Sequence, residues 1–458
     1  MSRRSRSPTP PTDSARLAKR PRLDFTPLTP EDYKDGVMLA PMVRSGALPT
    51  RLYALKHGAN LVWGPEIVDK AILHSERVVD PVTGVVSYNG KSKAIFTTHP
   101  IEKPYLIYQI GSADPELAVQ AAKTVMNDVA GIDLNCGCPK PFSTHAGMGA
   151  ALLTNPDLLC NILTALRSAL PPEISVSCKI RLLPTQEDTL KLVERIVNTG
   201  VNALTVHCRT RNMRPREKAL IERLREIVNF VEGMGRGIAI IENGDCVGYE
   251  DAKRIRDITG AHSAMIATAA EANPSCFSPT PLVDVEKDFV PAYVRLCKYL
   301  GHHWSVTKFC ATQFHGAHST ITKAEATGLK QILTKAKGFD DMNELCEPWS
   351  RGEEEFAEIV KAIEARGPGR RPKFQLEDEK WKELGERRQE SEIKNKENPP
   401  IVSSITSASQ ESQSPTEPET AEIPLPPAVS GKDADTPTPT PRPPALTKNA
   451  SEMSVLNL

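Results

Sequence analysis

The sequence lacks any segment suited to crossing a membrane or to directing export. Its 458 residues contain no apolar run of about eighteen residues, the length that a bilayer requires. The N-terminus carries no apolar stretch typical of an export signal. The ten cysteines are scattered, without the dense spacing of a secreted disulfide scaffold. We therefore expect a protein of a reducing compartment that has no membrane association.

Aromatic residues are scarce, and the last part of the chain has none. They make up 5% of the sequence, and no Phe, Tyr or Trp follows Trp381. The stretches 1–33 and 369–458 are rich in Ser, Thr, Pro or charged residues, so neither buries enough apolar surface to offset the entropy of ordering. We expect a disordered basic tail at 1–33, a charged helix candidate at 370–396, and a disordered tail after it.

Positive and negative charges balance over the whole chain, but the N-terminal tail is basic. The formal net charge is +0, while the first tail carries two basic clusters, Arg3–Arg6 and Lys19–Arg22. Split clusters of this kind are typical of a nuclear localisation signal or of weak contact with nucleic acid. A solvated tail without function is equally compatible with them. We expect the protein in the nucleus, the cytoplasm or both.

The middle of the chain alternates short apolar runs with helix-length amphipathic stretches. The eight apolar runs are 37–40, 61–63, 106–110, 132–134, 176–180, 203–206, 238–241 and 264–266. A strand followed by a helix, repeated eight times, predicts a (β/α)8 TIM barrel, which we place at 34–284. The long second connection, 64–104, has room for an inserted hairpin. Helical patterns then continue, and we expect a smaller all-helical domain at 285–368.

Parallel barrels bind and react at the carboxyl ends of their strands, so the residues just after each run are candidates. They are Pro41, Met42, Gln109, Asn135 to Cys138, Lys179, Arg181, His207, Arg209, Asn243 to Asp245, and Ala267 to Ala269. Loops after the seventh and eighth strands commonly hold a phosphate, which favours a phosphorylated cofactor. No Gly-x-Gly-x-x-Gly opens a helix after the first run, so a Rossmann dinucleotide site is not indicated.

Cys138 is the strongest candidate for chemistry among these residues. It stands in Asn-Cys-Gly-Cys-Pro, where an apolar run stops at residues typical of a loop that presents side chains. Cys136, two residues earlier, is more typical of a packing residue. The Cys-x-Cys pair also lacks the Cys-x-x-Cys spacing of zinc sites, so we expect no metal.

Several motifs together resemble the tRNA-dihydrouridine synthases, flavin enzymes that reduce uridine in tRNA. The motifs are LAPMVRSGALPTRLYALKHGA, DLNCGCPKPFSTHAGMGAALL, CKIRLL, VHCRTR and ENGD, spread from about residue 37 to the mid-340s. The resemblance is to the eukaryotic synthase 2 branch, which implies position 20 of the D-loop as the target. It also implies FMN as cofactor, NADPH as electron donor, tRNA as partner and tRNA binding by the helical domain. We expect a monomer.

The resemblance assigns roles to individual positions. The residues that it implies for FMN are Pro41, Met42, Gln109, Lys179, His207, Asn243, Gly244, Asp245, Ala267, Thr268 and Ala269. Cys138 would donate the proton to uracil C5, because an ordinary thiol stays protonated at neutral pH. Asn135 would orient the uracil, and Arg209 and Arg211 would contact the RNA.

One departure from the family pattern leaves other functions open. Ala267-Thr268-Ala269 stands where the family usually has an arginine flanked by small residues, so a cation at the cofactor phosphate is missing. A small-molecule FMN barrel oxidoreductase is one alternative, which reduction of free uracil compounds would favour. A non-catalytic tRNA-binding relative is the other, which a colourless protein that still bound tRNA would favour.

Overall fold

The computed structural model describes residues 26–214, 216–367 and 370–372, and most of the two tails expected at 1–33 and 369–458 lies outside these ranges. Eight parallel strands close into a barrel, because β2 pairs with both β1 and β7 while β12 pairs with β1. The strands are β1 (Val37–Leu39), β2 (Val62–Trp63), β7 (Leu106–Gly111), β8 (Gly131–Cys136), β9 (Ser175–Leu182), β10 (Ala203–Thr210), β11 (Ala239–Asn243) and β12 (Ser263–Ile266). Each strand overlaps one predicted apolar run, so the TIM barrel is confirmed.

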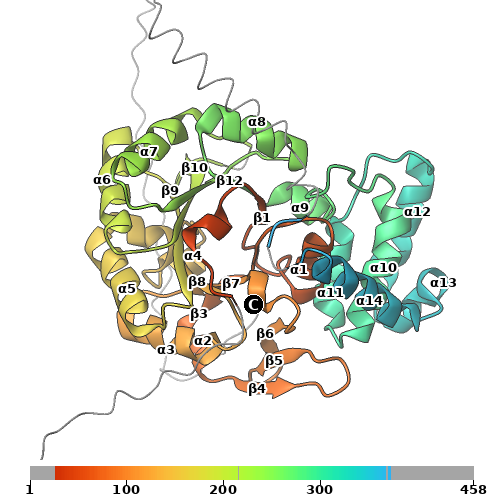
Figure 1. The fold of residues 1–458 in the computed structure, drawn as a ribbon. Helices are drawn as coiled ribbons and strands as arrows, with labels where there is room; N and C mark the ends of the chain where they lie inside the picture. Colours follow the sequence, from red (N-terminus) through yellow and green to blue (C-terminus); the bar gives the residue numbers. More distant parts are fainter. Residues whose placement is uncertain (1–25, 215, 368–369, 373–458) are drawn as a thin grey trace, which may run out of the picture. The chain divides into compact units, whose positions relative to one another are not determined.

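Helices surround the barrel and cover the outer face of its strands (Figure 1). They are α1 (Leu48–Lys56), α3 (Pro115–Val125), α5 (Pro156–Ala169), α6 (Gln186–Val197), α7 (Glu222–Gly233) and α8 (Tyr249–Thr259). Local sequence sets several of their starts. The side chains of Asp114, Asn155 and Thr185 accept hydrogen bonds from the first free N–H groups of α3, α5 and α6, which satisfies donors that a helix start leaves unpaired.

Residues predicted to belong to the N-terminal tail close the end of the barrel at which the strands begin. Residues 26–33 are folded, and they end in a short 3-10 helix, Pro30–Tyr33. Leu28 and Tyr33 are buried against the apolar side chains inside the barrel. The Tyr33 hydroxyl lies 2.7 Å from Oγ of Ser175, at the start of β9. Residues 26–33 therefore belong to the folded barrel rather than to the predicted tail, because these two side chains close the barrel.

The long connection between β2 and β7 carries a three-stranded antiparallel sheet and one further strand rather than the expected hairpin. After β3 (Ile67–Val68), which pairs with β7, and α2 (Asp69–Leu73), an antiparallel sheet forms from β4 (Glu76–Val79), β5 (Val86–Asn89) and β6 (Ala94–Thr98). Phe96 of β6 packs edge-on against Tyr108 of β7, with 4.9 Å between ring centroids. This contact fixes the insert to the outer face of the barrel.

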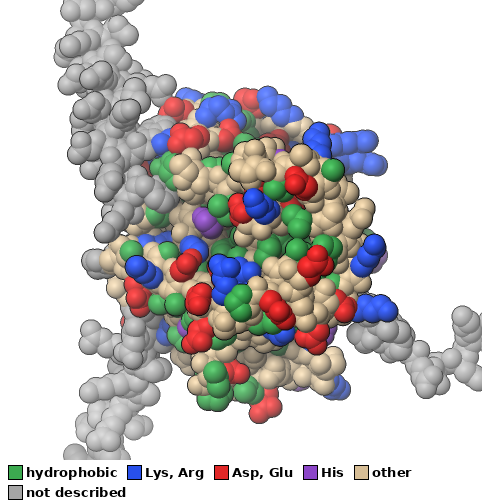
Figure 2. All heavy atoms as spheres, turned by 90° about the vertical axis from the view of Figure 1, so that its right-hand side faces the viewer, with side chains coloured by type: hydrophobic (Ala, Val, Ile, Leu, Met, Phe, Trp, Pro, Cys, Tyr) green, Lys and Arg blue, Asp and Glu red, His purple; other side chains and the backbone are tan. Residues whose placement is uncertain are grey.

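A group of helices follows the barrel, as expected, from residue 285. It contains α10 (Val285–Tyr299), α11 (Trp304–Gln313), α12 (Lys323–Lys335), α13 (Asn343–Cys346) and α14 (Arg351–Glu364). The rings of Phe289 and Tyr53 lie 4.7 Å apart and join α10 to α1 of the barrel. Figure 2 shows Lys and Arg interspersed with Asp and Glu on this side. Within the described ranges, no helix combines the length and apolar character needed to cross a bilayer.

Candidate active site

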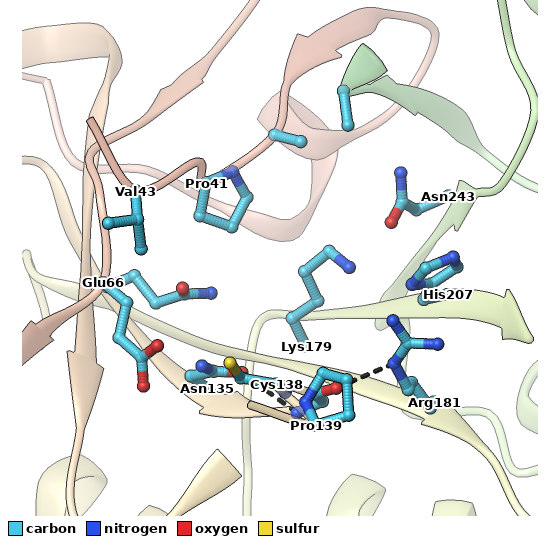
Figure 3. A pocket seen from close by; sticks show the side chains of 14 residues that line it. Pro41, Val43, Glu66, Asn135, Cys138, Pro139, Lys179, Arg181, His207 and Asn243 are labelled. Carbon is cyan, nitrogen blue, oxygen red and sulfur yellow. Dashed lines mark hydrogen bonds between the residues drawn. The ribbon is translucent and has the colours of Figure 1, made fainter. Parts of the chain in front are cut away.

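A cavity of about 230 Å³ opens at the carboxyl ends of the barrel strands. Its lining comes from the ends of all eight strands, the position at which TIM barrels carry their active sites. The lining residues are Ala40, Pro41, Val43, Glu66, Gln109, Asn135, Gly137, Cys138, Pro139, Lys179, Arg181, His207, Asn243 and Ala267 (Figure 3). Eight residues predicted for the site are therefore brought together: Pro41, Gln109, Asn135, Cys138, Lys179, His207, Asn243 and Ala267.

The register of the strands explains why distant residues meet here. Asn135 on β8 is level with Lys179 on β9, and His207 on β10 is level with both Arg181 and Asn243. Successive side chains of a strand point to opposite faces, so residues two apart share one face. The barrel closure therefore turns these polar side chains into one cavity.

Gln109 has a fixed orientation at this end of the barrel. Its Nε2 donates a 2.8 Å hydrogen bond to Oδ2 of Asp133, and the Ser177 hydroxyl donates a 2.7 Å bond to the other oxygen of that carboxylate. Asp133 is fully buried. One N–H of Nε2 is engaged in this way, and the Gln109 carbonyl oxygen, which no described residue binds, is available to accept a hydrogen bond from a ligand.

Asn135 shapes the loop that carries the candidate acid. Its Oδ1 accepts hydrogen bonds from the backbone N–H groups of Gly137 and Cys138, at 3.0 and 3.1 Å. The carbonyl of Cys138 in turn accepts from the N–H of Ala150 at 2.9 Å. Because Oδ1 is occupied, Asn135 offers its Nδ2 as the donor toward the cavity.

Gly149 allows this loop to close over the cysteine. Its φ is +58°, and an added Cβ would lie 2.7 Å from the Cys138 carbonyl oxygen. Only glycine meets both conditions without strain. The Cys138 side chain is half-buried, and burial, with a smaller effect from the charge of Glu66, raises the pKa of its thiol. The sulfur is consequently protonated at neutral pH and able to donate.

Cys136 has the packing role expected for it. It is fully buried in the apolar core, and its thiol donates to the Leu134 carbonyl at 3.7 Å. Over the part of the chain that the structure describes, no group of three or more His, Cys, Asp or Glu side chains is arranged to hold a metal ion.

Strands β9 and β10 place one ammonium, one guanidinium and one imidazole on the cavity wall, those of Lys179, Arg181 and His207. Burial, together with the nearby charge of Arg181, lowers the pKa of Lys179 to about 8. Burial also lowers the pKa of His207, and the charges of Lys179 and Arg181 add to this effect. His207 is therefore neutral at physiological pH, while the ammonium and guanidinium supply positive charge.

The two arginines predicted to contact RNA do not line the cavity. Arg209 is 5% exposed, donates through Nε to the Glu217 carbonyl at 2.7 Å and forms an ion pair with Asp245. Its Nη1 also lies 3.4 Å from Nε2 of His207, so the guanidinium contacts the imidazole ring. Arg211 is exposed. RNA contact by Arg209 and Arg211, and cofactor contact by Asp245, stay predictions.

Four other predicted cofactor residues lie beside the cavity rather than on its wall. Met42 is half-buried and packs against the apolar core, between two residues that do line the cavity. The Cα of Gly244 faces the carboxyl of Glu242, since an added Cβ would lie 2.5 Å from Oε1. Thr268 and Ala269 begin the short helix α9 (Thr268–Ala272). Their contact with a cofactor also stays a prediction.

Two charged lining residues, Arg181 and Glu66, had no assigned role. Arg181 donates through Nε to the Gly137 carbonyl at 2.8 Å, next to the cysteine loop, and was recognised only as a residue at a strand end. Glu66 was missed, although it follows β2 by three residues. Applying the strand-end rule to the second apolar run would have found it.

Comparison with known proteins identifies the family. The family described as "Dihydrouridine synthase (Dus)" matches residues 38–364. The tRNA-dihydrouridine(20) synthase [NAD(P)+] of Schizosaccharomyces pombe is 47% identical over 326 residues, which cover 69% of this chain and 66% of that protein. The protein of the same name from Saccharomyces cerevisiae is 45% identical over 264 residues, 54% of this chain and 67% of its own length. The matches thus span about two thirds of these relatives. The chain belongs to the dihydrouridine synthase family.

Proposed function

We propose that the protein reduces uridine 20 in the D-loop of tRNA to 5,6-dihydrouridine, with FMN as cofactor and NADPH as electron donor. The names of the two similar fungal proteins support the substrate, the position and a nicotinamide donor. The observation that carries the proposal is the Cys138 thiol on the wall of the same cavity that Lys179, Arg181 and His207 line.

The residues of the cavity fit a flavin. Lys179 makes no hydrogen bond or ion pair with the other described residues, and the Gln109 carbonyl oxygen is also free of protein partners there. A flat ring system that carries both an N–H donor and anionic oxygen or nitrogen acceptors would satisfy both groups. Asn243 and Ala267 would lie toward the phosphate end. The Ala267-Thr268-Ala269 segment contains no cation, so backbone N–H groups would have to hold the phosphate.

Cys138 and Asn135 would have separate roles toward the uracil: Cys138 would donate a proton, and Asn135 would orient the ring. Bound FMN, once reduced, would supply a hydride to C6 of the C5=C6 bond. The negative charge that then develops toward C5 and the C4 carbonyl needs a proton, and the Cys138 S–H bond supplies it while the sulfur becomes a thiolate. Nδ2 of Asn135 would donate to a uracil carbonyl and hold the ring beside the sulfur.

The test is to incubate the purified protein with unmodified tRNA, FMN and NADPH and to map dihydrouridine. We expect dihydrouridine at position 20. Cys138→Ala should bind tRNA as well as the parent but turn over at least about 100-fold more slowly. The matched control, Cys136→Ala, removes a thiol that faces the core and should keep most activity.

Other outcomes decide against the proposal. Unchanged turnover of Cys138→Ala would remove Cys138 as the acid. Reduction of free uracil compounds without RNA would favour the small-molecule oxidoreductase. A protein that binds tRNA but neither FMN nor NADPH would favour the non-catalytic relative.

A further inference from the structure

Glu66 places a carboxyl group on the cavity wall, and one of its oxygens is buried without a hydrogen-bond partner among the described residues. It lies between β2 and β3, and its Oε1 is buried and makes no hydrogen bond with the described residues. The end of β7 leaves room for it, since a Cβ added to Gly111 would lie 2.6 Å from Oε1. Burying an unpaired carboxyl group is costly, so its position beside the reactive loop calls for an explanation.

The polar groups around Glu66 all belong to the surroundings of Cys138. They are the Asn135 amide, the Cys138 thiol and the hydroxyl of Ser143 in the short helix α4 (Pro141–Thr144). The Ser143 hydroxyl is itself buried without a hydrogen-bond partner in the described chain. Figure 3 shows Cys138 between Glu66 on one side and Arg181 on the other. The thiol therefore lies between one acidic and one basic side chain.

We propose that Glu66 is a positioning residue that keeps Cys138 in its protonated form against the opposing charge of Arg181. This inference rests on the proposed function, in which the thiol must hold its proton until charge develops at C5. A nearby cation favours a thiolate, whereas a nearby carboxylate disfavours it. Arg181 cannot move away easily, because its guanidinium is bound to the Gly137 and Thr210 carbonyls. Glu66 supplies the compensating negative charge.

The other charged groups of the cavity do not replace Glu66. Lys179, which also lines the cavity, is a second cation and would favour the thiolate further. His207 is neutral there. After the thiol has donated its proton, repulsion between the thiolate and the Glu66 carboxylate favours re-forming the S–H bond with a proton from water. One carboxyl group would thus act both before and after the proton transfer.

The test measures the thiol directly and needs no turnover. The full-length protein, without NADPH or tRNA, is treated with iodoacetamide over a range of pH, and alkylation of the Cys138 peptide is followed by mass spectrometry. Only the thiolate reacts at an appreciable rate. In Glu66→Gln the alkylation profile should shift to lower pH, with a rate about 3- to 10-fold higher near pH 8.

Three comparisons separate this charge effect from a loss of structure. Glu66→Asp keeps the charge and should restore much of the parent profile. Glu242→Gln removes a buried carboxyl of β11 that is not among the cavity-lining residues, and it should leave Cys138 unchanged. Half-buried Cys160 is an internal reference whose rate should be equal in all variants, and circular dichroism melting confirms folding.

Overlapping profiles for Glu66→Gln and the parent, or a shift to higher pH, would overturn the inference. Neither result would alter the turnover measured for Cys138→Ala. The proposed function and the role of Glu66 are therefore decided by separate experiments.

Discussion

The side chains of Gln109 and Asp133 are joined by a 2.8 Å hydrogen bond below the cavity. Asp133 is fully buried, and burial raises its pKa, while hydrogen bonds from Gln109 and Ser177 favour its ionised form. The carboxylate can only accept, so the amide must present its nitrogen to Asp133 and its oxygen to the cavity. Asp133, which a ligand would not touch, therefore sets the orientation of the Gln109 amide, which a ligand would touch.

Asp133→Ala should weaken FMN binding by about 10-fold, because the Gln109 amide loses its fixed orientation. Gln109→Ala should have an effect of similar size, and the double variant should be no worse than either single one. Fluorescence titration with FMN measures all three affinities. Additive losses in the double variant would contradict the coupling.

FMN affinity should depend on pH through Lys179. Its pKa in the free protein is lowered to about 8, so the ammonium is present below that pH and is lost above it. Affinity should fall by about 10-fold as the pH rises through this range, since a charge-assisted hydrogen bond is lost. Lys179→Gln should bind FMN weakly with no such inflection. Titrations at several pH values test this, and an inflection that survives in Lys179→Gln would assign it to another group.

Glu242 should make stability depend on pH. Burial raises the pKa of its carboxyl from 4.5 to about 8, and neither oxygen has a hydrogen-bond partner in the described chain. A raised pKa means that the folded protein loses stability as the pH rises from the ordinary value of Glu toward about 8. Glu242→Gln should be more stable than the parent, on the order of 3 kcal/mol, above about pH 8 and nearly equal near pH 4. Urea unfolding at both pH values measures this. A difference independent of pH would indicate packing instead.

Arg51 and Glu102 form a buried ion pair that supports the rim of the cavity. Their side chains are 1% and 0% exposed, with 2.6 Å between Nη2 and Oε1, and Nη1 of Arg51 donates to the Gly46 carbonyl at 2.6 Å. Arg51→Met should destabilise the protein by about 3–5 kcal/mol, because the carboxylate remains buried and unpaired. Adding Glu102→Gln should recover part of this loss. Chemical denaturation of both variants is the measurement, and equal stability of the single and double variants would contradict the pairing.

The barrel and most of the cavity wall were predictable because both follow from short-range patterns. An apolar run ended by a polar residue marks a buried strand and its carboxyl end, and closure of the barrel brings such ends together. Lys179, His207 and Asn243 were found in this way. Tyr33 was not, since a single aromatic residue after a Pro-rich stretch resembles the end of a tail, and its burial depends on a barrel formed by residues far along the chain.

Side-chain partners were the part that the sequence could not predict. Arg209 follows His207 by two residues, and its contact with RNA stays a prediction. The sequence did not indicate that its guanidinium pairs with Asp245 and with a backbone carbonyl eight residues away. Such partners come from separate loops, whose mutual approach no local pattern encodes. Glu66 differs from these residues, because it follows the second apolar run by three residues and the strand-end rule would have found it.

Under the proposed function, the two hydrogen bonds from the Gly137 and Cys138 backbone to Oδ1 of Asn135 would couple recognition of the base to proton donation by the thiol. A substitution that turned the Asn135 amide to favour another nucleobase would break these hydrogen bonds. It would therefore also move the Cys138 sulfur away from the carbon that it would protonate. Changes of substrate preference through Asn135 should therefore be rare among active enzymes. New target positions would have to arise from changes in RNA-binding surfaces farther from the reacting ring.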